Sequence, residues 1–278
     1  MTPSPRTCVG PSGWDYPDWE GVVYPHRPSR PFHRLEYLAR RFDAAEIVST
    51  FDRPLRPEIS RLYLAKVAHN PEFLFTVVLG RRFTHERSLD RAEVAQFKDG
   101  LWPLQKAGRL GCLLMQFPWA FRFTSENREF LIQLRRTFHQ FPMAVEMRHA
   151  SWMADEALGT LIDYRLGFVN IDQPPYAGAT PPSALATSGI GYFRLHGRDP
   201  RYWKREFTGA GNGAQTDNYL YSPAELDPWV DRIRHIRPYT RNTFVILANP
   251  AAGKSVVNGL QLASLLSAGD GVPRQAVA

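Results

Sequence analysis

Eight short apolar runs, spaced along the whole chain, constrain its fold more than any other feature. Each run is rich in β-branched or aromatic residues, and longer amphipathic stretches separate them. The runs cover residues 6–10, 44–49, 73–80, 111–117, 143–149, 167–172, 191–197 and 243–249. This alternation is typical of βα units around a parallel sheet. Because eight strands close a barrel, whereas an open doubly wound sheet has about five to seven, the sequence predicts a single (β/α)8 TIM-type barrel of the α/β class.

Helices are expected between these runs. The predicted ranges are 30–42, 57–68, 90–108, 125–139, 153–165, 222–236 and 253–268. Ser222 followed by Pro223 matches a helix N-cap with proline at the first helical position. Two connections depart from the pattern, the Pro-rich stretch 173–189 and the stretch 198–221 with its glycines, aromatics and cations. They predict long irregular loops after strands six and seven.

The composition indicates one ordinary globular domain. The 278 residues, 44% of them hydrophobic, suffice for a sizeable core, and we expect one domain over 1–267 and a flexible tail over 268–278. Cys8 and Cys112 lie far apart in apolar runs, which argues against a disulfide framework or a cysteine zinc cluster. The N-terminus lacks the apolar segment of a signal peptide, and no run reaches the about 18 apolar residues of a bilayer span. These features predict a cytoplasmic protein with no membrane partner.

Three consecutive strands carry the side chains from which we predict a site. A strand inside a ring of helices turns its apolar set outward and its other set into the barrel. The residues that this rule directs toward the barrel axis are Glu146, Arg148, Asn170, Asp172, Arg194 and His196. They lie near the carboxyl ends of their strands, where barrel enzymes assemble their sites. Because buried ionisable groups cost free energy unless they pair or meet a ligand, the sequence predicts a pocket there.

These side chains allow two interpretations. In a structural one, Glu146 and Asp172 neutralise Arg148 and Arg194 in a polar layer of the barrel. In a functional one, the two arginines and Asp172 bind the ligand, Glu146 is a general base or an orienting group, and His196 is its acid/base partner. We therefore expect a small anionic or phosphorylated ligand and hydrolase or isomerase chemistry. The sequence identifies no cofactor and assigns no metal ligands.

Further candidate ligand contacts flank this group. The eighth run leads into ANPAAGKS, in which Asn249, Gly253 and Lys254 precede or open the last helix, whose free amides favour an anion. A nucleotide-binding phosphate loop is a poor fit, because the segment holds a single glycine and closes the predicted barrel. His85 is expected either at the rim of the site or as a solvated loop residue. Trp14 is expected either to stack on a ligand ring or to pack against other aromatic residues.

Several motifs together resemble the domain of unknown function 72 (YecE-like) family over about residues 7–267. The motifs are VGPSGWDYPDWEGVVYP, AAEIVSTF, FLFTVVLGRRFTHE, LLMQFP, AVEMRHASW, YFRLHGR and ANPAAGKSVVNGLQL. The resemblance implies a (β/α)8-type barrel without an established activity. By position it assigns to the family pattern Ser12, Trp14, Glu46, Thr84, His85, Glu146, Arg148, His149, Trp152, Arg194, His196, Gly197, Asn249 and Asn258. It also shows departures, since this chain has Val48, Asp52, Val78 and Ala248 where the family has Asn, Tyr, Lys and Asn, which implies an altered ligand or lost activity.

Two other functions stay open at this point. The 34 Lys and Arg exceed the 27 Asp and Glu by 7, and Arg81, Arg82 and the aromatic-cationic stretch 201–205 fit a nucleic-acid-binding protein or an endonuclease-like phosphodiesterase. The supply of metal ligands for such an enzyme is thin. The remaining alternative is a non-catalytic scaffold barrel.

Overall fold

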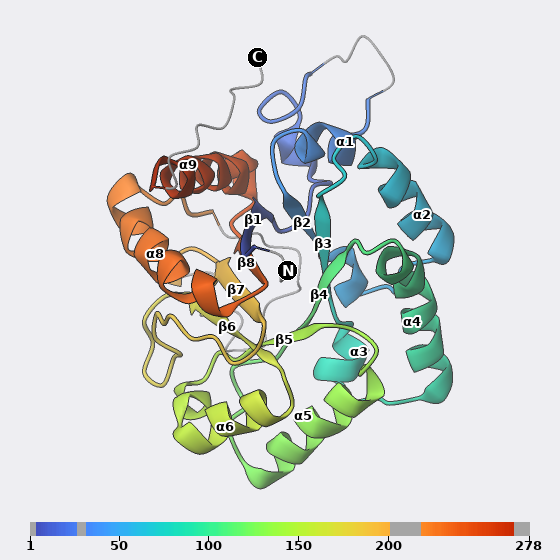
Figure 1. Cartoon of the computed structure of the whole chain (residues 1–278), viewed down its shortest axis with the longest axis vertical. Coiled ribbons are helices and arrows are strands. Elements are labelled where there is room, and N and C mark those ends of the chain that lie inside the picture. The colour runs from blue at the N-terminus through green and yellow to red at the C-terminus, as the bar shows by residue number, and fades with distance from the viewer. Residues whose placement is uncertain (1–3, 27–31, 201–217, 270–278) are drawn as a thin grey trace.

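The computed structural model describes residues 4–26, 32–200 and 218–269, which form a nearly closed barrel of eight parallel strands (Figure 1). The strands are β1 (Arg6–Pro11), β2 (Ala44–Ile47), β3 (Leu74–Val78), β4 (Leu110–Gln116), β5 (Met143–Glu146), β6 (Gly167–Asp172), β7 (Ile190–Leu195) and β8 (Asn242–Leu247). Their order in the sheet is β1-β8-β7-β6-β5-β4-β3-β2. The predicted (β/α)8 TIM-type barrel is confirmed.

Close approach of β1 and β2 brings the two ends of the sheet together. Ser12 forms an isolated parallel bridge with Glu46, and the Gly13 amide donates to the Glu46 carbonyl oxygen at 2.9 Å. Gly10 has to lack a side chain here, because a Cβ atom would lie 1.8 Å from the carbonyl oxygen of Ala44. This seam places the end of β2 beside the end of β1.

Helices surround the strands (Figure 1). They are α1 (Arg34–Ala39), α2 (Pro57–Lys66), α3 (Arg81–Thr84), α4 (Arg91–Lys106), α5 (Ser125–Thr137), α6 (Asp155–Asp163), α8 (Pro223–Ile236) and α9 (Lys254–Gly269), with short 3-10 turns at Pro17–Trp19, Ser49–Phe51, Ala150–Met153, Arg237–Tyr239 and Ala251–Gly253. Each predicted helical range overlaps one helix, whereas α3 was not predicted, because four residues give no periodic pattern. Pro223 starts α8 as expected, and the Ser222 amide donates to the Glu225 carboxylate at 2.9 Å.

Side chains fill the inside of the barrel, so its axis is a packed core. The inner cluster consists of Cys8, Ala44, Leu74, Val78, Cys112, Leu114, Ala144, Val169, Ile171, Tyr192, Phe244 and Ile246. A larger apolar cluster packs between the strands and the helices. Both cysteines are buried and form no disulfide among the described residues, and burial raises the pKa of Cys112.

In strand β6 the side chains face the opposite way from the predicted orientation. The register pairs Ile171 with Arg194 and Asp172 with Leu195. Because paired residues of parallel strands share a face, Ile171 lies on the inner face with Arg194, and Asp172 lies on the outer face. The prediction that Asn170 and Asp172 point to the axis is therefore wrong.

The loop that follows β6 explains this reversal. Asn170 donates from Nδ2 to the Leu185 carbonyl at 2.9 Å and accepts from the Leu185 amide at 2.8 Å and from the Ser183 hydroxyl at 2.7 Å. These hydrogen bonds satisfy the polar side chain of Asn170 on the outer face of the strand. Where a helix covers a strand, an apolar residue packs at such a position instead. The rule of an apolar outer face fails here because an irregular loop covers it.

The long loops occupy the predicted places. Residues 173–189 connect β6 to β7 and contain only an isolated bridge at Ala179, as expected of an irregular loop. Of the connection 198–221, residues 201–217 lie outside the described residues. Helix α9 continues to Gly269, and the tail stays a prediction because residues 270–278 also lie outside. Within the described ranges, no helix has the length and apolar character needed to cross a bilayer.

Candidate functional site

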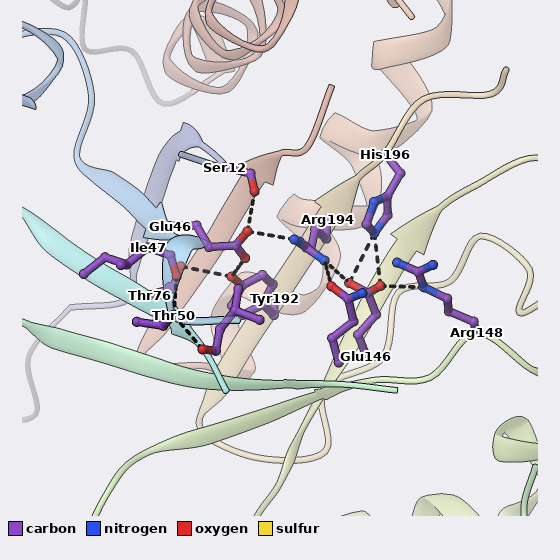
Figure 2. A network of polar contacts seen from close by, with 12 residues as sticks. Ser12, Glu46, Ile47, Thr50, Thr76, Glu146, Arg148, Tyr192, Arg194 and His196 are labelled. Carbon is purple, nitrogen blue, oxygen red and sulfur yellow. Dashed lines mark hydrogen bonds and ion pairs between the residues drawn. The ribbon is translucent and has the colours of Figure 1, made fainter. Parts of the chain in front are cut away.

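Five ionisable side chains meet inside the barrel at the carboxyl ends of its strands (Figure 2). They are Glu46 at the end of β2, Glu146 at the end of β5, Arg148 just beyond it, Arg194 in β7 and His196 directly after β7. All are buried, with 0% exposure of both glutamates and 4–5% exposure of the three basic residues. The structure thus brings together the predicted residues Glu146, Arg148, Arg194 and His196. We call these five residues the charged cluster.

Arg194 lies between the two carboxylates (Figure 2). Its Nη2 donates to Glu46 Oε2 at 2.8 Å, and its Nη1 donates to Glu146 Oε2 at 2.8 Å and to Gln116 Oε1 at 2.7 Å. The Nε atom is buried and has no hydrogen-bond partner among the described residues. Arg194 therefore bridges an acid of β2 and an acid of β5, and its predicted role as a ligand clamp stays a prediction.

Glu46 anchors the other half of the cluster. It accepts hydrogen bonds from the Ser12 hydroxyl and, at 2.8 Å, from the Tyr192 hydroxyl. The Tyr192 oxygen also lies 3.0 Å from Thr76 Oγ1. Burial, together with the charge of Glu46, raises the pKa of Tyr192 well above its ordinary value, so the phenol stays protonated and donates. The alternation along the strands did not assign Glu46 to the site. A single acid inside the apolar run 44–49 could have indicated a buried polar contact.

Glu146 forms a proton-sharing pair with His196. His196 Nε2 lies 3.1 Å from Oε1 and 3.2 Å from Oε2 of Glu146, and Arg148 Nε donates to Oε1 at 3.0 Å. Burial alone would raise the pKa of Glu146, but the neighbouring His196, Arg194 and Arg148 hold that pKa well below its ordinary value. Burial lowers the pKa of His196. At neutral pH we therefore assign an ionised Glu146 and a neutral His196 whose proton on Nε2 points at the carboxylate.

The loop after β6 holds the backbone at Arg148. The Thr180 amide donates to the Arg148 carbonyl at 2.9 Å, and the Thr180 hydroxyl donates to the Met147 carbonyl at 2.7 Å. Gln173 Nε2 adds a bond to the Arg148 carbonyl at 3.3 Å. This loop therefore holds the backbone from which the Arg148 side chain extends, a contact that no pattern in the sequence predicted.

Asp172 serves a different part of the molecule. It accepts from Arg198 Nε at 2.9 Å and 3.2 Å, and burial raises its pKa against the opposing hydrogen bonds of Tyr221 and Arg198. The Gly197 amide in turn donates to the Tyr221 hydroxyl at 2.6 Å. These contacts join the two described ends of the connection after β7, so Asp172 is a loop anchor on the outer face.

Trp14 and His85 lie apart from the bonds of the charged cluster. Trp14 packs edge-on against Tyr63 of α2, with ring centroids 5.0 Å apart, and also contacts Phe75. That position between the helices and the strands corrects its expected place over a ligand and supports the packing alternative. His85 ends α3, where its Nδ1 lies 2.9 Å from Thr84 Oγ1 and its ring packs on Phe51.

The predicted anion site before α9 is partly occupied by the protein itself. Asp18 accepts from the Ala252 amide at 2.6 Å, and the Gly253 amide donates to the Pro250 carbonyl at 3.0 Å. Lys254 reaches the side chain of Asn218. Asn249 donates from Nδ2 to the Tyr219 carbonyl at 2.8 Å and to Asn258 Oδ1 at 3.0 Å. These residues hold the end of the long connection to α9, and a ligand there stays a prediction.

The positions at which the chain departs from the family pattern are distributed around the same end of the barrel. Val78 is buried in the inner cluster, and half-buried Val48 and Phe51 pack against that cluster. The Ala248 amide donates to the Leu195 carbonyl at 2.8 Å, just after β8. Apolar side chains therefore stand at the ends of β2 and β3, next to the polar group around Glu46. Among the described residues no group of three or more His, Cys, Asp or Glu side chains is arranged to hold a metal ion.

Comparisons with known proteins agree with this architecture. A DUF72 family protein (TM1631) from Thermotoga maritima MSB8 has 29% sequence identity, a TM-score of 0.81 and coverage of 94% of this chain and 99% of its own. Two structures of a DUF72 family protein (EF0366) from Enterococcus faecalis V583, at 20% and 19% identity, have TM-scores of 0.77 and 0.79; they cover 95% and 98% of this chain, and 98% and 100% of their own chains.

The search of curated proteins found no match. A family model matches residues 8–277, nearly the whole chain. The chain therefore belongs to the family described as protein of unknown function DUF72.

Proposed function

We propose that this barrel binds a small anionic ligand at the carboxyl ends of its strands, and that Glu146 and His196 exchange a proton with it. One observation carries the proposal. The small exposed part of the charged cluster belongs to Arg148, Arg194 and His196, whereas Glu46 and Glu146 have no exposed surface. A molecule that enters from solvent therefore meets basic groups first, with the carboxylates behind them.

The arrangement of Glu146 and His196 supports acid/base chemistry. An ionised carboxylate that accepts from Nε2 fixes the ring orientation and its tautomer, and it stabilises the ring when the ring gains a proton. We assign the charge of the ligand to Arg148, which keeps a small exposed surface and whose backbone the loop after β6 holds, whereas Arg194 bridges Glu46 and Glu146. A proton-transfer step of this kind serves hydrolysis or isomerisation.

Thermal unfolding with added compounds tests the proposal. We expect inorganic phosphate, or a member of a panel of small phosphorylated and carboxylic metabolites, to raise the Tm of the wild-type protein, since a ligand that binds only the folded state stabilises it. Arg148→Met removes the cation and should abolish that shift relative to the variant's own baseline. Arg91→Met, at an exposed position of α4, is the matched control and should keep it. A shift that survives Arg148→Met, or no shift with any compound, would refute the proposal.

The nucleic-acid alternative receives less support. Arg82 is paired with Glu86 and, at 2.9 Å, with Glu93, and Arg81 Nε lies 3.4 Å from Glu86. These acids reduce the positive charge that the two arginines offer to phosphates. The aromatic-cationic stretch 201–205 lies outside the described residues, so its part in nucleic-acid binding stays a prediction.

A further inference from the structure

Resting on the proposed function, we propose that Tyr221 is a positioning residue for His196. Tyr221 lies at the far described end of the connection after β7, and His196 directly precedes the near end. The Tyr221 hydroxyl fixes the backbone from which the His196 ring extends, and so keeps the ring directed at Glu146. The way in which the two ends of this connection meet therefore sets the geometry of the acid/base pair.

The backbone turns directly after His196. The His196 amide donates to the Asp172 carbonyl oxygen at 3.1 Å, which continues the pairing of β6 with β7. Gly197 then has a φ of +91°, in the left-handed region that glycine adopts readily. Its buried amide donates to the Tyr221 hydroxyl at 2.6 Å. Because this amide belongs to the planar peptide unit that joins His196 to Gly197, fixing its direction fixes the rotation of the backbone at His196.

The Tyr221 hydroxyl is itself held in place. The side chain is buried, and burial together with the charge of Asp172 raises the pKa of Tyr221 well above its ordinary value, so the phenol keeps its proton. It donates that proton to the Asp172 carboxylate and accepts from the Gly197 amide. Arg198 Nε binds the same carboxylate at 2.9 Å. Both described ends of the connection therefore meet at Asp172.

Helix α9 fixes the backbone of Tyr221. The Tyr221 amide donates to Asn258 Oδ1 at 3.1 Å, and Asn258 Nδ2 donates to the Tyr221 carbonyl at 2.9 Å. Asn258 is buried and also accepts from Asn249 Nδ2 at 3.0 Å. A continuous series of hydrogen bonds thus runs from α9 through Tyr221 to the peptide next to His196.

Crystal structures of the full chain with Tyr221→Phe test this inference. The substitution keeps the ring and removes the hydroxyl, so the buried Gly197 amide loses its acceptor, which is unfavourable. Rotation of that peptide toward another acceptor turns the His196 side chain with it. His196 Nε2 lies 3.1 Å and 3.2 Å from the two Glu146 oxygens in the wild type. We expect the variant to show the ring beyond hydrogen-bond reach of both oxygens, more than about 3.5 Å away, or in two orientations.

NMR spectra of the His196 ring give a second measurement, in solution. His196→Gln identifies the ring C–H resonances by their absence, and we expect Tyr221→Phe to shift them. Tyr24→Phe is the matched control, because it removes the hydroxyl of another buried tyrosine, which donates to the Trp14 carbonyl at 2.7 Å. Both variants lose a buried hydrogen bond, but only Tyr221→Phe should move the ring and its resonances.

Asn258→Ala serves if Tyr221→Phe does not fold. It keeps the Tyr221 hydroxyl and removes the two bonds that hold the Tyr221 backbone, so it should shift the same His196 resonances.

Each outcome has a separate meaning. An unmoved His196 ring with unchanged resonances in Tyr221→Phe, or in Asn258→Ala where that variant decides, would overturn the inference. Equal shifts in Tyr24→Phe would overturn it as well. None of these measurements needs a ligand, so a moved ring in a protein that no anion stabilises would refute the proposed function and leave the positioning of His196 standing.

Discussion

Glu146 is the residue on which the charged cluster depends most, because it contacts Arg148, Arg194 and His196 at once. Glu146→Gln keeps the shape of the side chain and removes its charge. Arg194 then keeps its ion pair with Glu46, whereas Arg148 loses its ion pair with Glu146. Loss of one partner of a buried ion pair costs about 3–5 kcal/mol, so we expect the free energy of unfolding in urea to fall by about that amount.

Two further variants separate charge from shape in that experiment. Glu129→Gln on the exposed side of α5 is the matched control and should change stability by no more than about 0.5 kcal/mol. Adding Arg148→Met to Glu146→Gln removes a cation that has lost its ion pair with Glu146 and should restore part of the lost stability. A Glu146→Gln variant as stable as the wild type would show that the cluster is not held by charge pairing.

At the scale of the elements, the seam between β1 and β2 sets the shape of the barrel end. Gly10→Ala places a Cβ atom 1.8 Å from the Ala44 carbonyl oxygen. The contacted atoms belong to the backbone, which cannot rotate away as a flexible side chain could. We expect the variant to lose at least about 2 kcal/mol of stability, in the upper range of overpacking, as measured by urea unfolding. The strands would have to separate just below Ser12 and Glu46, so ligand binding should weaken as well.

Gly159→Ala is the matched control for that substitution. Gly159 lies inside α6, and a Cβ atom there would meet no heavy atom within 4 Å. Alanine favours the helix over glycine, so stability should rise by about 0.5–1 kcal/mol. If Gly10→Ala behaved like Gly159→Ala, the close approach at the seam would not exist in solution.

The strands also show how far a sequence alone predicts such a site. The alternation of apolar and polar residues identified the inward side chains of β5 and β7. It succeeded there because helices cover the outer faces of those strands, where apolar side chains pack. It failed at β6, where Asn170 finds its partners in the loop at Ser183 and Leu185. Local patterns do not report which distant segment covers a strand. For the same reason strand alternation did not find Glu46, which only the family resemblance singled out, since its role depends on Arg194, which lies 148 positions away.

At the scale of the whole molecule, the charged cluster should make the stability of the fold depend on pH. The folded-state pKa of His196 lies below its ordinary 6.5, so as the pH falls below about 6.5 the unfolded chain binds a proton that the folded chain does not. Glu146, with a lowered pKa, contributes stability above about pH 4.3 that is lost as the pH falls through its folded-state value. Both groups therefore act in the same direction, and acidification destabilises the protein.

Urea unfolding between about pH 7 and pH 5 isolates the histidine part of this effect. Each histidine held neutral adds a loss of at most about 1.4 kcal/mol per pH unit. His33 and His149, whose pKa values burial also lowers, add to the slope. His196→Gln should reduce the slope by up to one proton, whereas His139→Gln, at an exposed histidine, should leave it unchanged. Asp172, whose pKa burial raises, acts in the opposite sense. A slope that His196→Gln leaves unchanged would mean that the folded protein does not hold His196 in its neutral form.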